Sequence, residues 1–323
     1  MTFDNVTVAI CANVKTYSES VELNVSYAVM EILVAIFAVL GNGLVILVFF
    51  LKRRLRRRTN YYIVSLAVAD LLFGLFGIPI AILVKKKPIG IPQSCFMCLL
   101  ATSVLLVFCT VSIFSLLLIS FDRFISILYP LQYAKIQSWV TIEIAACWVL
   151  GGVVGFLPLG WHVELPITRC FYHDVVTEGY QMFRFVFVIL APAVLIFMIY
   201  GMIYKIVLHQ RRKEKILKPT SCCPSESQTC IDHRIKREFK ATLNIFIIVL
   251  FFMVCWFPLN IVKSIKISCT TCNIPDNFIT YGIVLTHFNS AINPLMYAYH
   301  LRDFRHEILK LLGCRRREAP ISY

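Results

Sequence analysis

Long apolar stretches alternate with short polar ones along almost the whole chain. Each apolar stretch is long enough to cross the hydrocarbon core of a bilayer, about 30 Å thick, as an α-helix. The pattern predicts an all-α membrane protein, a bundle of seven transmembrane helices with no second folded domain. The predicted spans are residues 27–51, 61–84, 98–128, 140–161, 180–208, 241–267 and 278–299. Prolines, serines and mixed charges in residues 209–237 predict a mobile linker.

The basic residues predict the orientation of this bundle. The net charge is +14, a value that in a soluble protein would suggest nucleic acid as a partner. Here Lys and Arg cluster in short connections after the first, fifth and seventh spans, as in cytoplasmic loops of membrane proteins. We therefore expect residues 1–26 outside the cell and no nucleic-acid partner. The triplet Lys85 to Lys87 falls in a predicted outer loop and opposes this pattern.

The residues after the seventh span predict a short helix on the inner leaflet. Between Leu301 and Leu312, apolar residues recur at helical spacing on one face, which is typical of an amphipathic interfacial helix. This face comprises Phe304, Ile308, Leu311 and Leu312. Residues 300–323 are therefore expected to form this helix and a cytoplasmic tail. Cys314 near its end is expected either to carry a palmitoyl group or to be an unmodified thiol.

The predicted topology also sorts the cysteines and the glycosylation sequons. Asn5 and Asn24 begin Asn-X-Ser/Thr tripeptides in the predicted extracellular segment, so both are expected to carry glycans. Disulfides persist outside the cell, and six cysteines fall there. We expect bridges between Cys98 and Cys170 and between Cys269 and Cys272, which leaves Cys11 and Cys95. Other connectivities remain open from the sequence.

Polar and proline residues inside apolar spans are costly and therefore point to function. The set comprises Gly41-Asn42, Leu66 to Asp70, Asp122-Arg123-Phe124, Trp148, Pro192 with Tyr200, Cys255 to Pro258 and Asn293 to Tyr297. Taken together, in this order and on seven spans, these residues resemble the rhodopsin-like class of G-protein-coupled receptors. The resemblance covers nearly the whole chain.

The resemblance implies an ion site and an activation switch inside the bundle. A buried carboxylate needs donors or a cation, and the implied sodium site comprises Asp70, Ser112, Asn289 and Ser290. Prolines that remove backbone hydrogen bonds give kinks, either as pivots or as static packing features. The implied switch comprises Asp122, Arg123, Tyr200, Glu238, Pro258, Asn293, Pro294 and Tyr297. Sodium would act as an allosteric modulator, and no other cofactor or metal is expected.

The residues present disfavour two ligand classes. Amine receptors need a carboxylate in the outer half of the third span, where no acid precedes Asp122. Opsins need a lysine in the seventh span for a Schiff base, and His287 stands near that place. A closer resemblance is to adenosine receptors, through residues 112–117, 174–176, 255–259 and 269–272 with His287 and Ala298-Tyr299.

This second resemblance implies a ligand site in the outer half of the bundle. In adenosine receptors, a glutamate of the first span and a histidine of the seventh pair near the ribose, here Glu31 and His287. An aromatic ring stacks on adenine, here Tyr172. The implied ligand-binding residues are Glu31, Leu106, Cys109, Tyr172, His173, Arg184, Trp256, Leu259, Asn260, Lys263, Ile283, Thr286 and His287.

Two positions depart from the adenosine-receptor pattern. Lys263 stands where that family has an asparagine, and an ammonium donates hydrogen bonds but accepts none. His173 replaces the loop glutamate that meets the exocyclic amine. Arg184 and Lys263 suggest an anionic ligand if both point inward, whereas the alternative is that both reach the outer headgroups. Asn260, one turn from Lys263, offers another amide for a purine.

We therefore expect a plasma-membrane receptor for adenosine or a related purine. The sequence holds no catalytic triad, metal cluster or phosphate-cradling loop, so the chain is not expected to be an enzyme. The expected partners are a heterotrimeric G protein, arrestin, receptor kinases and membrane lipids. One alternative is a receptor of the same fold for a different, anionic small molecule. The other is a transporter or scavenger that does not signal.

Overall fold

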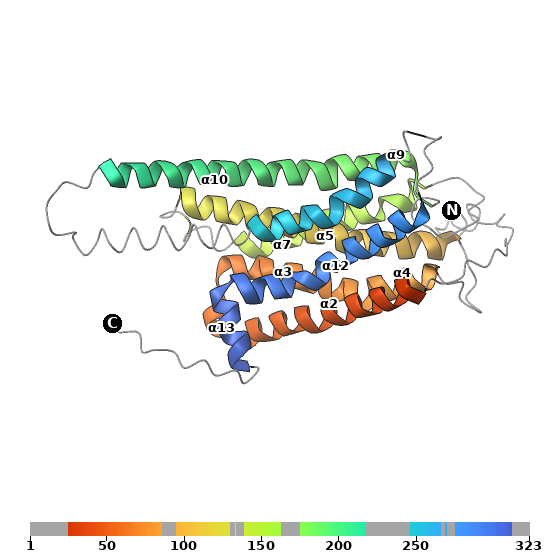
Figure 1. Cartoon of the computed structure of the whole chain (residues 1–323), viewed down its shortest axis with the longest axis horizontal. Coiled ribbons are helices and arrows are strands. Elements are labelled where there is room, and N and C mark those ends of the chain that lie inside the picture. Colours follow the sequence, from red (N-terminus) through yellow and green to blue (C-terminus); the bar gives the residue numbers. More distant parts are fainter. Residues whose placement is uncertain are drawn as a thin grey trace.

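The computed structural model is a bundle of long helices that run side by side (Figure 1). It describes residues 25–85, 95–129, 133, 139–162, 175–216, 246–265, 269 and 275–311. Within these residues, the only β contact is an isolated bridge between His162 and Val176. The fold is all-α, as the apolar pattern predicts.

Seven helical spans account for most of the described residues. The first is α2 (Val25–Leu51), and the short η1 (Arg53–Leu55) leads to the second, which joins α3 (Arg58–Leu72), η2 (Phe73–Gly77) and α4 (Ile78–Lys85). The third is α5 (Cys95–Leu128), and the fourth joins α7 (Val140–Phe156) and η4 (Leu157–Leu159). The fifth joins α9 (Glu178–Phe183), η5 (Arg184–Leu190) and α10 (Ala191–Ile216). The sixth is the helix Phe246–Ile265, the seventh is α12 (Asp276–His300), and α13 (Arg302–Leu311) follows.

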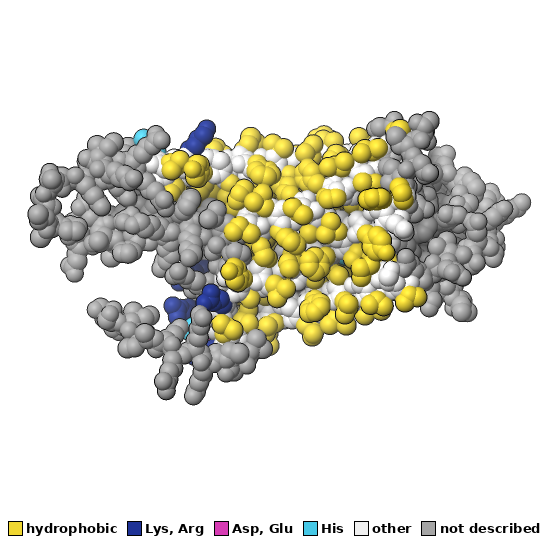
Figure 2. Space-filling view, in the orientation of Figure 1, with side chains coloured by type: hydrophobic (Ala, Val, Ile, Leu, Met, Phe, Trp, Pro, Cys, Tyr) yellow, Lys and Arg dark blue, Asp and Glu magenta, His cyan; other side chains and the backbone are white. Residues whose placement is uncertain are grey.

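The surface of the bundle is suited to lipid. Six of the spans are long and apolar enough to cross a membrane. The other span, α12, is 25 residues long, but it is less apolar because its buried face includes polar residues such as His287 and Asn293. Outward-facing Phe37 and Val149 are 59% and 64% exposed. Figure 2 shows hydrophobic side chains over the middle of the visible face and described Lys and Arg residues at the end where α13 lies. One end of the membrane bundle is therefore basic.

Small residues let α7 approach α5 closely. A Cβ added at Gly155 would lie 2.6 Å from the backbone nitrogen of Val107, and one added at Gly151 would lie 2.4 Å from the Val111 side chain. Gly151 and Gly155 are four residues apart, so they share one helix face. This contact between the third and fourth spans leaves no space for a larger side chain.

Two π-helical segments widen spans shortly before a proline. The segment η2 ends at Gly77, two residues before Pro79, and η5 ends at Leu190, two residues before Pro192. Proline lacks a backbone donor and its ring crowds the preceding turn, so a wider turn accommodates it. In the fifth span, the widened segment begins with Arg184, which is buried.

Two helix boundaries differ from the predicted ones. The helix α10 continues to Ile216, into residues predicted as linker, because residues 210–216 are good helix formers without glycine or proline. The helix α3 begins at Arg58 rather than at Tyr61. Arg58 was predicted to lie in a basic loop, but it is 4% exposed and has acidic partners, described below.

The short helix α13 packs against α2 and confirms the predicted C-terminal helix. Phe304 and Ile308 on its apolar face are buried. Leu311 on the same face is exposed, and Leu312 lies outside the described residues.

An acid also holds α13 to the bundle. Glu307 lies 3.5 Å from Lys52 Nζ and 3.4 Å from His306 Nδ1. Burial raises the pKa of Glu307, but the hydrogen bond from His306 and the charge of Lys52 outweigh burial and hold this pKa below its ordinary value. The carboxylate is therefore favoured in its charged form in the docked helix.

Candidate functional site

An acid and a histidine from the first and seventh spans meet inside the bundle. The Nδ1 atom of His287 lies 2.9 and 2.8 Å from the two carboxylate oxygens of Glu31. Glu31 is fully buried, His287 is 9% exposed, and the Phe73 ring packs edge-on against the imidazole. Because a carboxylate accepts hydrogen bonds, Nδ1 carries the hydrogen and Nε2 is the ring atom left for a ligand. The structure thus makes the contact that the resemblance implies.

A second group places Arg184 beside Trp256, with Lys263 within electrostatic range of Arg184. The guanidinium carbon of Arg184 lies 5.7 Å from the centre of the Trp256 ring. Lys263 is near enough for its charge and that of Arg184 to repel each other, and both charges act on the thiol of Cys109. Three spans therefore converge here, and Arg184 points inward rather than toward the headgroups.

The remaining predicted ligand residues differ in what they contact. Asn260 Nδ2 donates to the Trp256 carbonyl oxygen at 2.8 Å, and Thr286 Oγ1 donates to the Ile283 carbonyl oxygen at 2.7 Å. Both polar side chains are therefore already bonded to their own helices. Leu106 and Leu259 are buried and Ile283 is partly buried, whereas Tyr172 and His173 lie outside the described residues.

Asp70 is the centre of a buried polar group midway along the bundle. Its Oδ1 accepts from Ser290 Oγ at 2.8 Å and from Ser112 Oγ at 3.3 Å, and its Oδ2 accepts from Asn293 Nδ2 at 2.7 Å. The buried Oδ1 of Asn289 has no hydrogen-bond partner among the described residues. Hard cations prefer oxygen ligands, so the carboxylate and the two hydroxyls that meet here have the chemistry of a sodium site.

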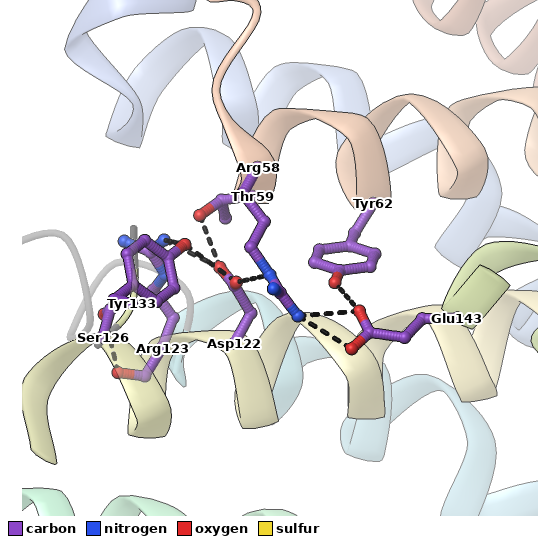
Figure 3. Close-up of polar contacts among 8 residues, drawn as sticks. All are labelled: Arg58, Thr59, Tyr62, Asp122, Arg123, Ser126, Tyr133 and Glu143. Atoms are coloured by element: carbon purple, nitrogen blue, oxygen red, sulfur yellow. Dashed lines mark hydrogen bonds and ion pairs between the residues drawn. The ribbon is translucent and has the colours of Figure 1, made fainter. Parts of the chain in front are cut away.

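Four side chains surround the Asp122 carboxylate near the C-terminal end of α5 (Figure 3). Its Oδ2 accepts from Thr59 Oγ1 at 2.6 Å and from Arg123 Nη2 at 2.8 Å. Its Oδ1 accepts from the Tyr133 hydroxyl at 2.8 Å and lies 3.0 Å from Arg58 Nε. Burial, together with the charge of Asp122, raises the pKa of Tyr133, so this hydroxyl remains a donor.

Arg58 connects Asp122 to a second acid, Glu143 of α7 (Figure 3). Its Nη2 lies 2.8 Å from both oxygens of Glu143, and the Tyr62 hydroxyl also donates to Glu143. Sequence reasoning missed Arg58, Tyr62 and Glu143 as members of this site. The one available signal was an acid in the first turn of an otherwise apolar span.

The other predicted switch residues are distributed over the fifth to seventh spans. Tyr200 is buried with its ring 4.9 Å from that of Phe246, and the buried Tyr297 hydroxyl has no hydrogen-bond partner in the part of the chain that is described. Pro294 lies inside α12, and Pro258 lies inside the sixth span. Glu238, the predicted partner of Arg123, lies outside the described residues.

Only some of the residues predicted to form disulfides or to be modified lie in the described part of the chain. Cys98 and Cys269 are each disulfide-bonded, but their expected partners Cys170 and Cys272 lie outside the described residues, so both pairings stay predictions. The same is true of the glycosylation sites Asn5 and Asn24 and of the palmitoylation site Cys314.

Comparison with known proteins gives the family. The family model "7 transmembrane receptor (rhodopsin family)" matches residues 41–297. Adenosine receptor A2a of Equus caballus is 34% identical over 317 residues, covering 92% of this chain and 74% of that receptor. The A2a receptors of Homo sapiens and Canis lupus familiaris are each 33% identical, over 88% and 90% of this chain and 72% and 74% of their own length. Such proteins are receptors rather than enzymes, which confirms that prediction. The chain belongs to the rhodopsin family of seven-transmembrane, G-protein-coupled receptors.

Proposed function

We propose that this receptor binds adenosine or a related purine from outside the cell and activates a heterotrimeric G protein inside it. The name of the similar A2a receptors supports the ligand class. The contact between Glu31 and His287 carries the proposal within the chain itself. Buried ionisable groups inside a membrane are costly and mark ligand or ion sites. Glu31 orients the imidazole so that Nε2 is available to a ribose hydroxyl.

The orientation of the chain is part of this proposal. Described Lys and Arg residues gather at the end of the bundle where α13 lies (Figure 2), and a basic end faces the cytoplasm. The disulfide-bonded Cys98 is near the start of α5, and Cys269 precedes α12. Both belong to the opposite end, where an oxidising exterior would preserve a disulfide. These features support the proposal that the N-terminus lies outside the plasma membrane.

The inner half supplies the proposed signalling step. A sodium ion held by Asp70, Ser112, Asn289 and Ser290 would favour one arrangement of the spans. Release of Arg123 from Asp122 would then accompany opening of the inner end to the G protein.

G-protein activation in transfected cells tests this function. The ligands are adenosine, inosine and guanosine, and the variants are Glu31→Gln and, as a control for loss of an exposed acid at the outer end, Glu178→Gln. We expect a purine to activate the native receptor, Glu31→Gln to lower potency by roughly tenfold or more, and Glu178→Gln to leave it unchanged. A receptor that reaches the surface but ignores every purine contradicts the ligand assignment. Equal potency in Glu31→Gln and native receptor contradicts the role of the pair.

A further inference from the structure

Arg184 is a buried positive charge in the membrane-spanning part of the chain. It begins the widened segment η5, is 5% exposed, and its guanidinium lies 5.7 Å from the ring of Trp256. A side chain that snorkelled to the outer headgroups would instead be exposed. A charge held at such depth most often serves a substrate or ion site.

Lys263 brings a second positive charge to the same place. It follows Trp256 by seven residues, about two helical turns, so both project from one face of the sixth span. The charges of Lys263 and Arg184 repel each other, and each acts on Cys109 of α5. The two side chains therefore bring two positive charges to the region between the third, fifth and sixth spans.

The indole of Trp256 adds a hydrogen-bond donor to this basic cluster of Arg184, Lys263 and Trp256. Its Nε1 is buried and has no hydrogen-bond partner among the residues that the structure describes. A buried donor without an acceptor is costly, and an acceptor on a ligand would satisfy it. The ionised side chains and the indole all donate, and none of them accepts.

We propose that the ligand carries a phosphate or carboxylate group and that Arg184 and Lys263 bind this group. A planar guanidinium matches two oxygens of an oxyanion, and an ammonium contributes a compact point charge. The inference rests on the proposed function for the position of the ligand site but changes the ligand from a neutral nucleoside to an anion. A nucleoside monophosphate is the purine of this kind, and a small dicarboxylic acid is the non-purine.

The test compares neutral and anionic probes on the full-length receptor. Adenosine, adenosine monophosphate and succinate are added to transfected cells for G-protein activation and to purified receptor in nanodiscs for thermal unfolding. The variants are Arg184→Gln and Lys263→Gln, with Lys205→Gln as the control because Lys205 is an exposed cation of the same span as Arg184. We expect one of the anions to activate and stabilise the native receptor. Each cluster variant should weaken its potency by roughly tenfold or more, and Lys205→Gln should not.

The outcomes separate this inference from the proposed function. Activity of adenosine with both anions inert overturns the anion site and leaves the purine receptor intact. Activity of succinate alone supports the anion site and overturns the purine. If adenosine monophosphate activates the receptor and this activity requires Arg184 and Lys263, the result supports the anion site and the purine receptor together. If an anion still activates the Arg184→Gln and Lys263→Gln variants, the residue assignment is overturned. A receptor that reaches the cell surface but responds to none of the three probes overturns both proposals.

Charge-retaining variants protect the test against misfolding. If either glutamine variant fails to reach the membrane, Arg184→Lys and Lys263→Arg should keep the anion response, because the positive charge remains. Loss of that response in both folded, charge-retaining variants counts against the anion site. The comparison of adenosine with adenosine monophosphate on the native receptor needs no variant.

Discussion

The contacts that Arg58 and Tyr62 make with Asp122 and Glu143 form one network, the inner network. Replacing Arg58 by methionine tests this network most directly. Arg58 is 4% exposed and bridges Asp122 of α5 and Glu143 of α7 (Figure 3). Methionine keeps much of the length and apolar contact of the side chain but removes the charge. The substitution should destabilise the folded receptor because the buried Asp122 and the partly exposed Glu143 both lose a positively charged partner.

The size of this effect follows from the geometry. Charges 3.0 Å apart, the distance from Arg58 Nε to Asp122 Oδ1, attract by about 5–6 kcal/mol at an effective dielectric constant of about 20. Desolvation of the ions offsets much of this energy. Asp122 also keeps Thr59, Tyr133 and Arg123 as donors, and the partly exposed Glu143 can be hydrated. We therefore expect a net loss of about 2 kcal/mol in the free energy of unfolding, below the 3–5 kcal/mol typical of a charge left buried alone.

Thermal unfolding of purified receptor with a thiol-reactive fluorophore measures the change. Free cysteines of the described residues, among them buried Cys147 and Cys255, become reactive on unfolding. Glu143→Gln should cost less than Arg58→Met, and the double variant should cost less than the sum, because both substitutions remove one shared contact. Arg53→Met removes an exposed base as the control. Native-like unfolding of Arg58→Met, or strict additivity in the double variant, would refute the coupled network.

Two further predictions concern helix packing and pH. Gly155→Leu should abolish correctly folded receptor at the cell surface, because a Cβ at this position would lie 2.6 Å from the Val107 backbone nitrogen. Gly152→Leu is the control and should express normally, because nothing lies within 4 Å of a Cβ at that position. Equal surface labelling of the two variants would contradict the packing. The pKa of Glu307 is lowered in the folded state. At pH values above the ordinary carboxyl pKa, the contact of Glu307 with Lys52 therefore stabilises the docked position of α13. This stabilisation is lost as the pH falls through the lowered pKa. The protection factor of the α13 amides in hydrogen exchange, which corrects for the slower chemical exchange at low pH, should fall on acidification in native receptor but not in Glu307→Gln.

Most of the architecture is predictable because the membrane imposes a simple rule on sequence. Backbone groups in lipid must bond within a helix, so a long apolar stretch has one available structure. The predicted and observed spans therefore agree within a few residues at most ends. The exception is α10, which extends to Ile216, because helix formation beyond the membrane depends on propensity rather than on hydropathy.

The membership of Arg58, Tyr62 and Glu143 in the inner network was not predictable, for a different reason. Arg58 stands in a run of basic residues whose charge explains topology equally well. Its burial depends on Glu143, 85 residues later in the chain, and no pattern of spacing joins two such residues. The contact of Glu31 with His287, separated by 256 residues, was accessible only through the resemblance to a receptor family. Long-range polar pairs thus lie beyond periodicity and composition.

The four polar groups of the bundle differ in which spans they tie together, and this difference bears on signalling. The pair Glu31–His287 and the basic cluster involve the sixth or seventh span, and Asp70 bonds to Ser290 and Asn293 of α12. Among the described residues, the partners of Asp122 come instead from α3, α5 and the residues after α5. On the proposed function, a ligand therefore acts on the sixth and seventh spans, which contain Pro258 and Pro294, while Arg58 and Glu143 hold the second, third and fourth spans in place. Release of Arg123 is then expected to break its own bond to Asp122, while the contacts of Asp122 with Arg58 and Thr59 stay in place.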